Sequence, residues 1–473
     1  MLRKTLDNLP LSRPYLVVAA IAVLIFYPTW IRLAEAWLEF EQVLAHGLAT
    51  AVIFLGILLI HPPGHVDRQT QLKPYHLAGA ALLVVTTLIW GLLELVRIDT
   101  LAYLLLPAGM VATAWALLGL PRTLKFLPYV LLLSLSLPIW ADVIPALVDL
   151  ASVVVGTWVS WFGMTALIEG NSITLPYGRL LIADGCSGIR YFAIAILLAM
   201  MTSILNDYRW RGWLITLLGA ALLGMIANWV RITILVVVAY ETDMQSEMLT
   251  DHETMGWMVF GAFILPALYF SPVRRRTTKQ NLPANAGIVY RKGLIAIATA
   301  IVLGPIALVL AQNTASQKPE WIIDLPGFQQ VQSAKLPLPI ALPEDLEEQV
   351  WHSGNTWISF AQSHKKSTDE KLVPYLPQLF DKSIWHVEEQ LEPGLQVYRN
   401  ILTRNKVLVA QWYKVGSRTS WSYRNAKLLQ IPAALAGETR FALITVQAFC
   451  GPRDCAEVLT RMRTALASVE EQI

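Results

Sequence analysis

The chain has 473 residues, of which 55% are hydrophobic, with 17 tryptophans, a mean hydropathy of +0.49 and a formal net charge of +3. This composition excludes an ordinary water-soluble protein of that length and is typical of a multi-pass membrane protein. We therefore expect the lipid bilayer as a partner, and no nucleic acid.

Nine apolar stretches are long enough to cross the ~30 Å hydrocarbon core of a bilayer as helices. The first follows Met1-Leu-Arg-Lys but has no small-residue cleavage site, so it predicts a retained helix rather than a signal peptide. The stretches are 15–31, 44–60, 76–95, 101–119, 127–148, 188–205, 212–239, 254–271 and 293–311.

The Lys and Arg residues of the connecting segments predict the orientation. With the N-terminus in the cytoplasm, the inner segments hold fifteen of these residues, whereas the outer loops before the last stretch hold four, namely Arg32, Arg97, Arg179 and Arg190. The same orientation puts everything after residue 312 outside.

Three regions follow from this pattern: a transmembrane core over 1–272, a basic inner hairpin with the ninth helix over 273–312, and a tail over 313–473. The fold class we predict is an all-α polytopic membrane protein with about eight core helices and a ninth. A soluble α+β domain follows it.

The tail opens with a proline-rich stretch, which predicts an extended linker. Residues 396–403, 406–415 and 441–449 have the pattern of strands, and 454–470 has that of a closing helix.

One outer segment, 149–187, is unusually long. It contains an apolar piece over 151–167, and its residues over 171–183 alternate like a short hairpin with a turn at Pro176-Tyr177-Gly178. A structured element thus presents the residue Cys186 at the membrane surface.

Cys186 is the only cysteine before the tail, and it stands in the sequence Asp-Gly-Cys-Ser-Gly-Ile-Arg190. Its small neighbours let the backbone turn into a helix that begins near Gly188. A thiol at a helix N-terminus lies at the positive end of the macrodipole, which favours the nucleophilic thiolate. The alternative is a buried structural cysteine.

Arg231 interrupts an otherwise apolar helix in the sequence Asn228-Trp-Val-Arg-Ile. An arginine there costs about 2.5–3.5 kcal/mol on insertion scales and requires a partner or a watery cavity. Asn228 shares its helix face. The alternative is an arginine that snorkels to the outer interface.

His252 stands where the predicted topology brings the chain back into the membrane from outside. The alternative is a solvated polar residue, the usual state of a histidine in a loop. Three consecutive helices therefore deliver Cys186, Arg231 and His252 to one level. An imidazole can accept the proton of a thiol and return it to a leaving amine, while an arginine can hold the developing oxyanion. The set predicts acyl transfer or peptide cleavage at the membrane edge.

Other chemistries have little support in the sequence. No HExxH, Gly-x-Ser-x-Gly or phosphate-binding loop occurs, and the three cysteines do not form a zinc pattern, so we expect no metal and no organic cofactor. A transporter or export scaffold for polysaccharide or solute is the main alternative, with Arg231 binding an anion and Cys186 structural. No inverted repeat of interrupted helices supports it.

Cys450 and Cys455 lie in the tail, on the side predicted to be oxidising. Their spacing favours a local disulfide that closes a tight loop, which leaves Cys186 as the free thiol. A redox pair is the alternative.

The motifs around Cys186, Arg231 and His252, in this order on successive helices, resemble the exosortase/archaeosortase family over roughly residues 15–272. The resemblance implies a polytopic cysteine transpeptidase-like enzyme in which Cys186 is the nucleophile, His252 the acid/base and Arg231 the transition-state stabiliser. Asn228 and Arg190 would support them.

The resemblance also implies the partners. These are exported proteins that end in a tripartite sorting signal, made of a Pro-Glu-Pro-like motif, one transmembrane helix and a basic end. Cleavage at the periplasmic face of a bacterial inner membrane would form a thioester and pass the acyl group to water or an unidentified acceptor nucleophile. Such systems often accompany exopolysaccharide genes.

The tail, with Gln-Trp-Tyr-Lys-Val-Gly at 411–416 and the segment 421–429, looks like the exosortase-associated periplasmic domain, which is fused in some systems and separate in others. Cys450 and Cys455 are not part of that pattern.

Overall fold

The computed structural model of the chain describes residues 12–39, 46–64, 76–138, 140, 143–249, 252–271, 291–314, 319–331, 336–365, 370–376, 379–381, 384–451 and 455–472. The chain forms two compact units. The first, the helical unit, comprises Met1–Trp90 and Asp99–Leu303, and the second, the sheet domain, comprises Gly91–Ile98 and Gly304–Ile473.

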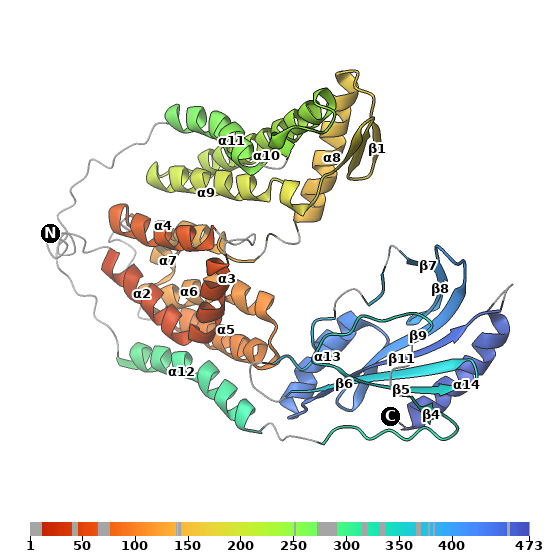
Figure 1. Cartoon of the computed structure of the whole chain (residues 1–473). Coiled ribbons are helices and arrows are strands. Elements are labelled where there is room, and N and C mark those ends of the chain that lie inside the picture. The colour runs from red at the N-terminus through yellow and green to blue at the C-terminus, as the bar shows by residue number, and fades with distance from the viewer. Residues whose placement is uncertain are drawn as a thin grey trace. The chain divides into compact units, whose positions relative to one another are not determined.

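The helical unit consists of apolar segments that form helices (Figure 1). The loops between them contain glycine, proline or charged residues. The boundaries with the sheet domain fall inside α5 and, further along the chain, inside α12. The described helices up to that point are α2 Ser12–Ile25, α3 Tyr27–Leu38, α4 Gly47–Ile60, α5 Leu77–Val96, α6 Asp99–Leu118, α7 Leu120–Ser134, α8 Ile144–Trp161, α9 Ile189–Leu205, α10 Trp210–Glu241, α11 His252–Tyr269 and α12 Arg291–Thr314.

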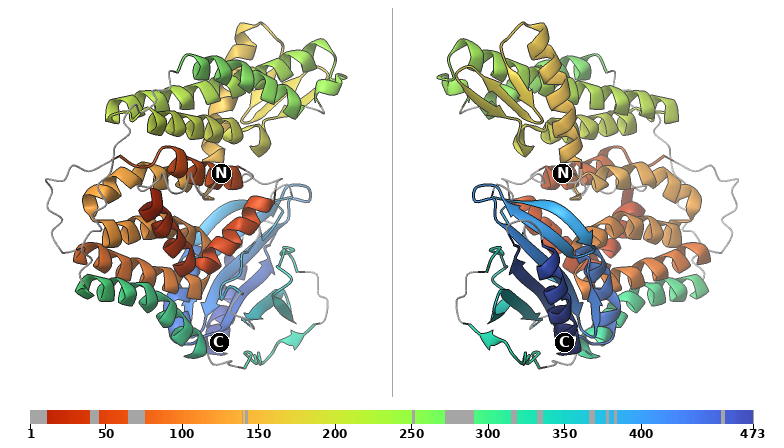
Figure 2. Two further views of the ribbon diagram at one scale, coloured as in Figure 1. Left: turned by 90° about the vertical axis from the view of Figure 1, so that its left-hand side faces the viewer. Right: turned by 90° about the vertical axis from the view of Figure 1, so that its right-hand side faces the viewer.

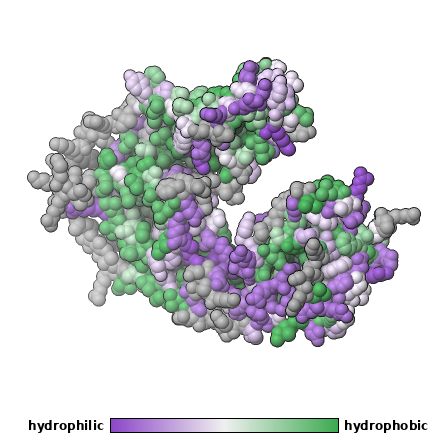
Figure 3. Space-filling view, viewed as in Figure 1, coloured by the Kyte–Doolittle hydropathy of each residue, from purple (hydrophilic) through white to green (hydrophobic). Residues whose placement is uncertain are grey.

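Five helices among the described residues are long and apolar enough to cross a membrane, or six if the bent pair α2 and α3 is one span. The five include α5, α6, α8, α10 and residues Ile295–Gln312 of α12. On α10, Leu214, Ile215, Leu218 and Leu222 are half or more exposed, and Figure 3 shows hydrophobic residues covering much of the visible face of the helical unit. Such an apolar exterior is suited to lipid rather than to water.

The first predicted span, 15–31, is not one straight helix. α2 and α3 meet at Phe26 with a bend of 95°. Pro28 has no amide proton for the carbonyl four residues before it, and its fixed φ suits the first turn of a new helix.

The prediction of one helix over 127–148 is wrong. α7 ends at Ser134, and α8 begins at Ile144. Two tryptophans satisfy carbonyl groups freed after α7: Trp37 Nε1, from α3, donates to Ser136 O at 2.9 Å, and Trp140 Nε1, five residues on, donates to Leu135 O at 2.9 Å. These hydrogen bonds stabilise a break inside a run that hydropathy reads as continuous.

The apolar piece predicted within a loop at 151–167 is likewise mostly helix, because α8 continues to Trp161. In Figures 1 and 2, α8 crosses α9, α10 and α11 at a steep angle, while α9 and α11 both pack along α10. The hairpin predicted after it is confirmed. Strand β2 (Ser172–Leu175) pairs with β3 (Gly178–Leu181), and β1 (Leu167–Glu169) extends the sheet.

The sheet domain is built on an eight-stranded antiparallel sheet with the order β4-β5-β6-β11-β9-β8-β7, with β10 paired to β9. The strands predicted at 396–403, 406–415 and 441–449 are confirmed as β8, β9 and β11, and the closing helix as α14. The elements are β4 Gln329–Gln330, β5 Glu347–Ser353, β6 Thr356–His364, β7 Trp385–Glu392, β8 Leu395–Asn400, β9 Lys406–Val415, β10 Arg418–Ser420, α13 Tyr423–Leu435, β11 Arg440–Phe449 and α14 Ala456–Gln472.

Successive side chains of a strand point to opposite faces of the sheet, so the core of the sheet domain has one part on each face. On β9, Leu408 and Trp412 belong to a cluster that includes Met462 of α14, whereas Tyr413 and Val415 belong to one that includes Ala426 of α13. Each helix therefore covers one face of the sheet.

Candidate active site

Cys186 ends a short 3₁₀ turn (Asp184–Cys186) between strand β3 and helix α9. Its backbone N–H donates to Ala183 O at 2.8 Å, and its side chain is partly exposed. Gly188 is the residue before α9 and has a φ of +78°, a conformation that glycine adopts without strain. The turn and the glycine place the thiol beside the N-terminus of α9.

Asn228 of α10 fastens this turn to the neighbouring helix. Its side-chain amide donates to the carbonyl oxygen of Cys186 at 3.0 Å. A Cβ on Gly188 would stand 2.6 Å from Asn228 Nδ2, so the close approach of the two elements requires glycine there. The other amide atom, Asn228 Oδ1, is buried and has no hydrogen-bond partner in the described part of the chain.

Arg231, one turn further along α10, is 3% exposed. Its Nε is buried without a hydrogen-bond partner, and none of the ion pairs among the described residues involves it. Its guanidinium carbon lies 5.6 Å from the ring centroid of Tyr191 on α9, within the range of a cation–π contact. A buried arginine without an acidic partner is costly in a membrane protein, and such groups mark functional sites.

Arg231 also contacts the helix that His252 begins. A Cβ on Gly256 of α11 would stand 2.7 Å from Arg231 Nε, and it would overlap the hydroxyl oxygen of Tyr191. His252 is the partly buried first residue of α11 and lies four residues before Gly256. Residues four apart share a helix face, so His252 lies one turn from Gly256, on the face of α11 that meets Arg231.

An ion pair joins the starts of α9 and α11. Arg190 Nη1 lies 3.0 Å from Glu253 Oε1, with side-chain exposures of 43% and 65%. Such an exposed pair contributes less than about 1 kcal/mol, so it aligns the two helix starts more than it stabilises the fold.

The height of Arg231 in the membrane follows from helix geometry. From Trp210 to Arg231, α10 rises about 32 Å at 1.5 Å per residue, which is close to the ~30 Å thickness of a hydrocarbon core. Arg231 therefore lies one membrane thickness away from Arg209 and Arg211. The rest of α10, up to Glu241, continues beyond it, and α8 packs against α10 with the ring centroids of Trp158 and Trp229 6.4 Å apart.

Hydrogen bonds and contacts thus bring together Cys186, Asn228 and Arg231, and they connect Arg190 and Gly256 to the same group. Sequence reasoning missed two members, Tyr191 and Gly256. The available signals were a tyrosine five residues after the cysteine and a glycine one turn after the histidine.

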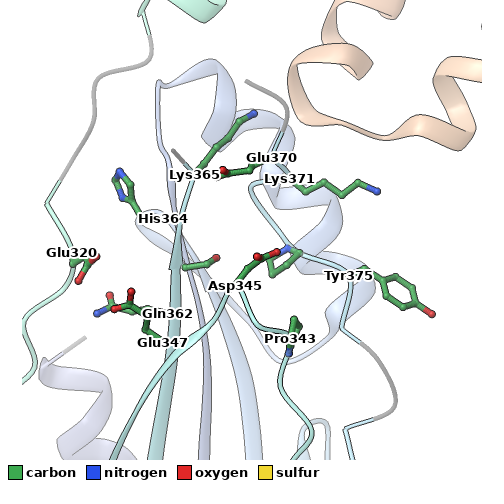
Figure 4. Close-up of a pocket in the computed structure, with 12 residues that line it drawn as sticks. Glu320, Pro343, Asp345, Glu347, Gln362, His364, Lys365, Glu370, Lys371 and Tyr375 are labelled. Atoms are coloured by element: carbon green, nitrogen blue, oxygen red, sulfur yellow. The ribbon is translucent and has the colours of Figure 1, made fainter. Parts of the chain in front are cut away.

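The sheet domain contains two described cavities, of about 490 and 500 Å³. The first, in Figure 4, mixes charges of both signs, with Asp345 and Glu347 beside Gln362, and with Lys365 and Lys371. The second is lined by uncharged residues, among them Tyr413, whose pKa burial raises to about 12. Neither contains a residue predicted for catalysis.

Cys450 and Cys455 form a disulfide in the structure, and Cys186 is the free cysteine. Among the described residues, no group of three or more His, Cys, Asp or Glu side chains is arranged to hold a metal ion.

One family model matches the chain, that of transmembrane exosortase (Exosortase_EpsH), over residues 30–269. No curated protein matches the chain, and neither does any solved structure. The matched residues contain the whole group around Cys186 and end before Gly304, where the main part of the sheet domain begins.

Proposed function

The chain belongs to the transmembrane exosortase family, a family of multi-pass membrane proteins that sort exported proteins by transpeptidation, and from this premise we propose a specific reaction. The chain is a membrane-embedded cysteine peptidase or transpeptidase that cleaves a C-terminal sorting signal of the Pro-Glu-Pro type. Cleavage takes place at the periplasmic face of a bacterial inner membrane and passes through a thioester on Cys186.

The observation that carries this proposal is the unpaired polar pair on α10. Within the residues that the structure describes, Arg231 Nε is a buried donor without an acceptor, and Asn228 Oδ1, one turn away, is a buried acceptor without a donor. A peptide group offers one acceptor and one donor, so a bound substrate backbone would satisfy both atoms. Asn228 also holds the carbonyl of Cys186, which brings that substrate next to the thiol.

In the proposed reaction, His252 takes the proton of Cys186, and the sulfur attacks the carbonyl carbon of the scissile peptide bond. Arg231 stabilises the negative charge on the carbonyl oxygen. The C–N bond then breaks, and His252 gives its proton to the leaving amine. Water or another acceptor nucleophile attacks the thioester and releases Cys186.

Trapping the thioester tests this reaction. When membranes that contain the chain and a substrate with a C-terminal signal receive hydroxylamine, we expect the new C-terminus of the substrate to carry a hydroxamate, because hydroxylamine attacks thioesters. Mass spectrometry of the released fragment measures it. A product that carries only a carboxylate at every hydroxylamine concentration would contradict an acyl-enzyme intermediate. Solute flux without any cleavage would support the transporter instead.

For the topology we propose nine crossings, made by α2 with α3, by α4 to α7 and by α9 to α12, while α8 lies on the periplasmic side. The steep angle between α8 and its neighbours α9 to α11 supports this assignment. If α8 crossed as well, Arg209, Arg211 and the arginines at 274–276 would lie outside, against the positive-inside rule.

Reporter fusions check this topology. Fusions after residues 163 and 320 are expected to report the periplasm, and a fusion after 208 the cytoplasm. A cytoplasmic signal at 163 would show that α8 crosses the membrane and would remove Cys186 from the periplasmic face.

The sheet domain fits an accessory role of the exosortase-associated type. Its strand pattern supports this part of the proposal, and its placement beyond the last crossing puts the disulfide of Cys450 and Cys455 in an oxidising compartment.

A further inference from the structure

Tyr191 lies among the groups assigned to catalysis, although no step above uses it. It follows Cys186 by five residues on α9, is 6% exposed, and lies within electrostatic range of Cys186, Arg190, Arg231 and Glu253. Its hydroxyl makes no hydrogen bond within the part of the chain that the structure describes.

The ring of Tyr191 is held by α11. It stacks on Phe260 with ring centroids 5.2 Å apart, and it meets Trp257 edge-on at 5.4 Å. Its hydroxyl occupies the space that a side chain at Gly256 would fill. The position of the ring is therefore fixed by three residues of one helix before Arg231 is considered.

Among the described residues no carboxylate forms an ion pair with Arg231, and the ring of Tyr191 lies beside its guanidinium instead. The guanidinium carbon is 5.6 Å from the ring centroid, and the Nε atom packs against the same glycine as the tyrosine hydroxyl. A ring attracts a cation without forming an ion pair, so the positive charge stays available for a substrate oxygen. A carboxylate in the same position would neutralise it.

We propose that Tyr191 is a positioning residue that holds the guanidinium of Arg231 through its ring, and that Gly256 provides the clearance for this contact. The inference rests on the proposed function, because it gives Arg231 its role in the reaction. Tyr191 acts through Arg231 and not on the substrate.

A double-mutant cycle tests it on the full-length chain in membranes with a signal-bearing substrate. Tyr191→Leu is expected to lower the maximal rate about 10- to 30-fold with little change in KM, because the lost contact acts in the transition state. Tyr191→Phe keeps the ring and is expected to stay within about threefold of wild type. In the Arg231→Ala background, Tyr191→Leu is expected to cause no further loss.

Gly256→Ala provides an independent arm. The new Cβ would overlap the tyrosine hydroxyl, so we expect a loss similar to that of Tyr191→Leu, and we expect partial recovery when Tyr191→Phe removes the overlapping oxygen. The amount of each variant in the membrane and the maleimide labelling of Cys186 show whether it is folded.

Additive losses in the cycle would overturn the proposal, since Tyr191 would then act without Arg231. A Phe variant as impaired as the Leu variant would also overturn it, because the hydroxyl rather than the ring would matter. Neither result affects the proposed function, which is tested separately by the loss of Cys186 and by the trapping of the thioester.

Discussion

Membranes that carry the Cys186→Ala variant are expected to release no detectable product from a protein with a Pro-Glu-Pro-type C-terminal signal. Removing the nucleophile of a protease lowers turnover by a factor on the order of 10⁶, and no second free cysteine occurs in the chain to replace it. The fold should tolerate the change, because the turn at Cys186 is held by backbone groups and Asn228, not by the thiol. A mobility shift of the substrate on a gel measures the outcome.

The matched control removes the other two cysteines together. Cys450→Ala with Cys455→Ala is expected to keep processing, because this disulfide closes a loop in the sheet domain and belongs to no catalytic group. If processing persisted in Cys186→Ala with the variant present in normal amounts, Cys186 would be structural. The alternative function, a transporter or export scaffold, would then be favoured.

The His252→Ala variant is expected to retain between about 10⁻⁴ and 10⁻² of the wild-type rate, the range in which general acid–base catalysis contributes. The histidine begins α11, one turn before Gly256, which contacts Arg231, so its loss removes the proton acceptor without disturbing Arg231. Initial rates of substrate cleavage, corrected for the amount of protein in the membrane, measure this effect.

Glu253→Gln is the control for His252, because it changes the adjacent residue at the same helix end. It breaks the exposed pair with Arg190 and is expected to cost no more than about fivefold. If Glu253→Gln impaired cleavage as strongly as His252→Ala, the start of α11 would matter as a structural element and not through its imidazole.

Hydropathy predicted the helical core and the sheet domain, because long apolar runs and period-two strands are local properties of the sequence. The break between Ser134 and Ile144 escaped it, since the carbonyl groups after α7 are satisfied by Trp37, from a helix almost a hundred residues earlier. The length of α8 escaped it for a related reason. This helix packs against α10, with Trp158 against Trp229, and this contact between distant segments is not visible in the local hydropathy.

The candidate site was predictable where rare residues interrupt an apolar background, as Cys186 and Arg231 do. The contacts of Tyr191 and Gly256 were not, because a tyrosine and a glycine are ordinary in membrane helices and acquire meaning only when α9 and α11 meet at Arg231. Asn228 shows an intermediate case. Its helix face followed from its spacing to Arg231, but its hydrogen bond to Cys186 depends on how α9 packs against α10.

The length of α10 has a consequence for what the chain selects. Because Arg231 stands about 32 Å along the helix from Trp210, α10 on the proposed topology sets a fixed distance between the inner face of the membrane and Arg231. A substrate that crosses the membrane as a helix with its basic end inside is measured against it, and each residue added to that helix moves the scissile bond by about 1.5 Å. On the proposed function, the chain selects substrates by the length of their membrane segment as well as by the short motif beside that segment.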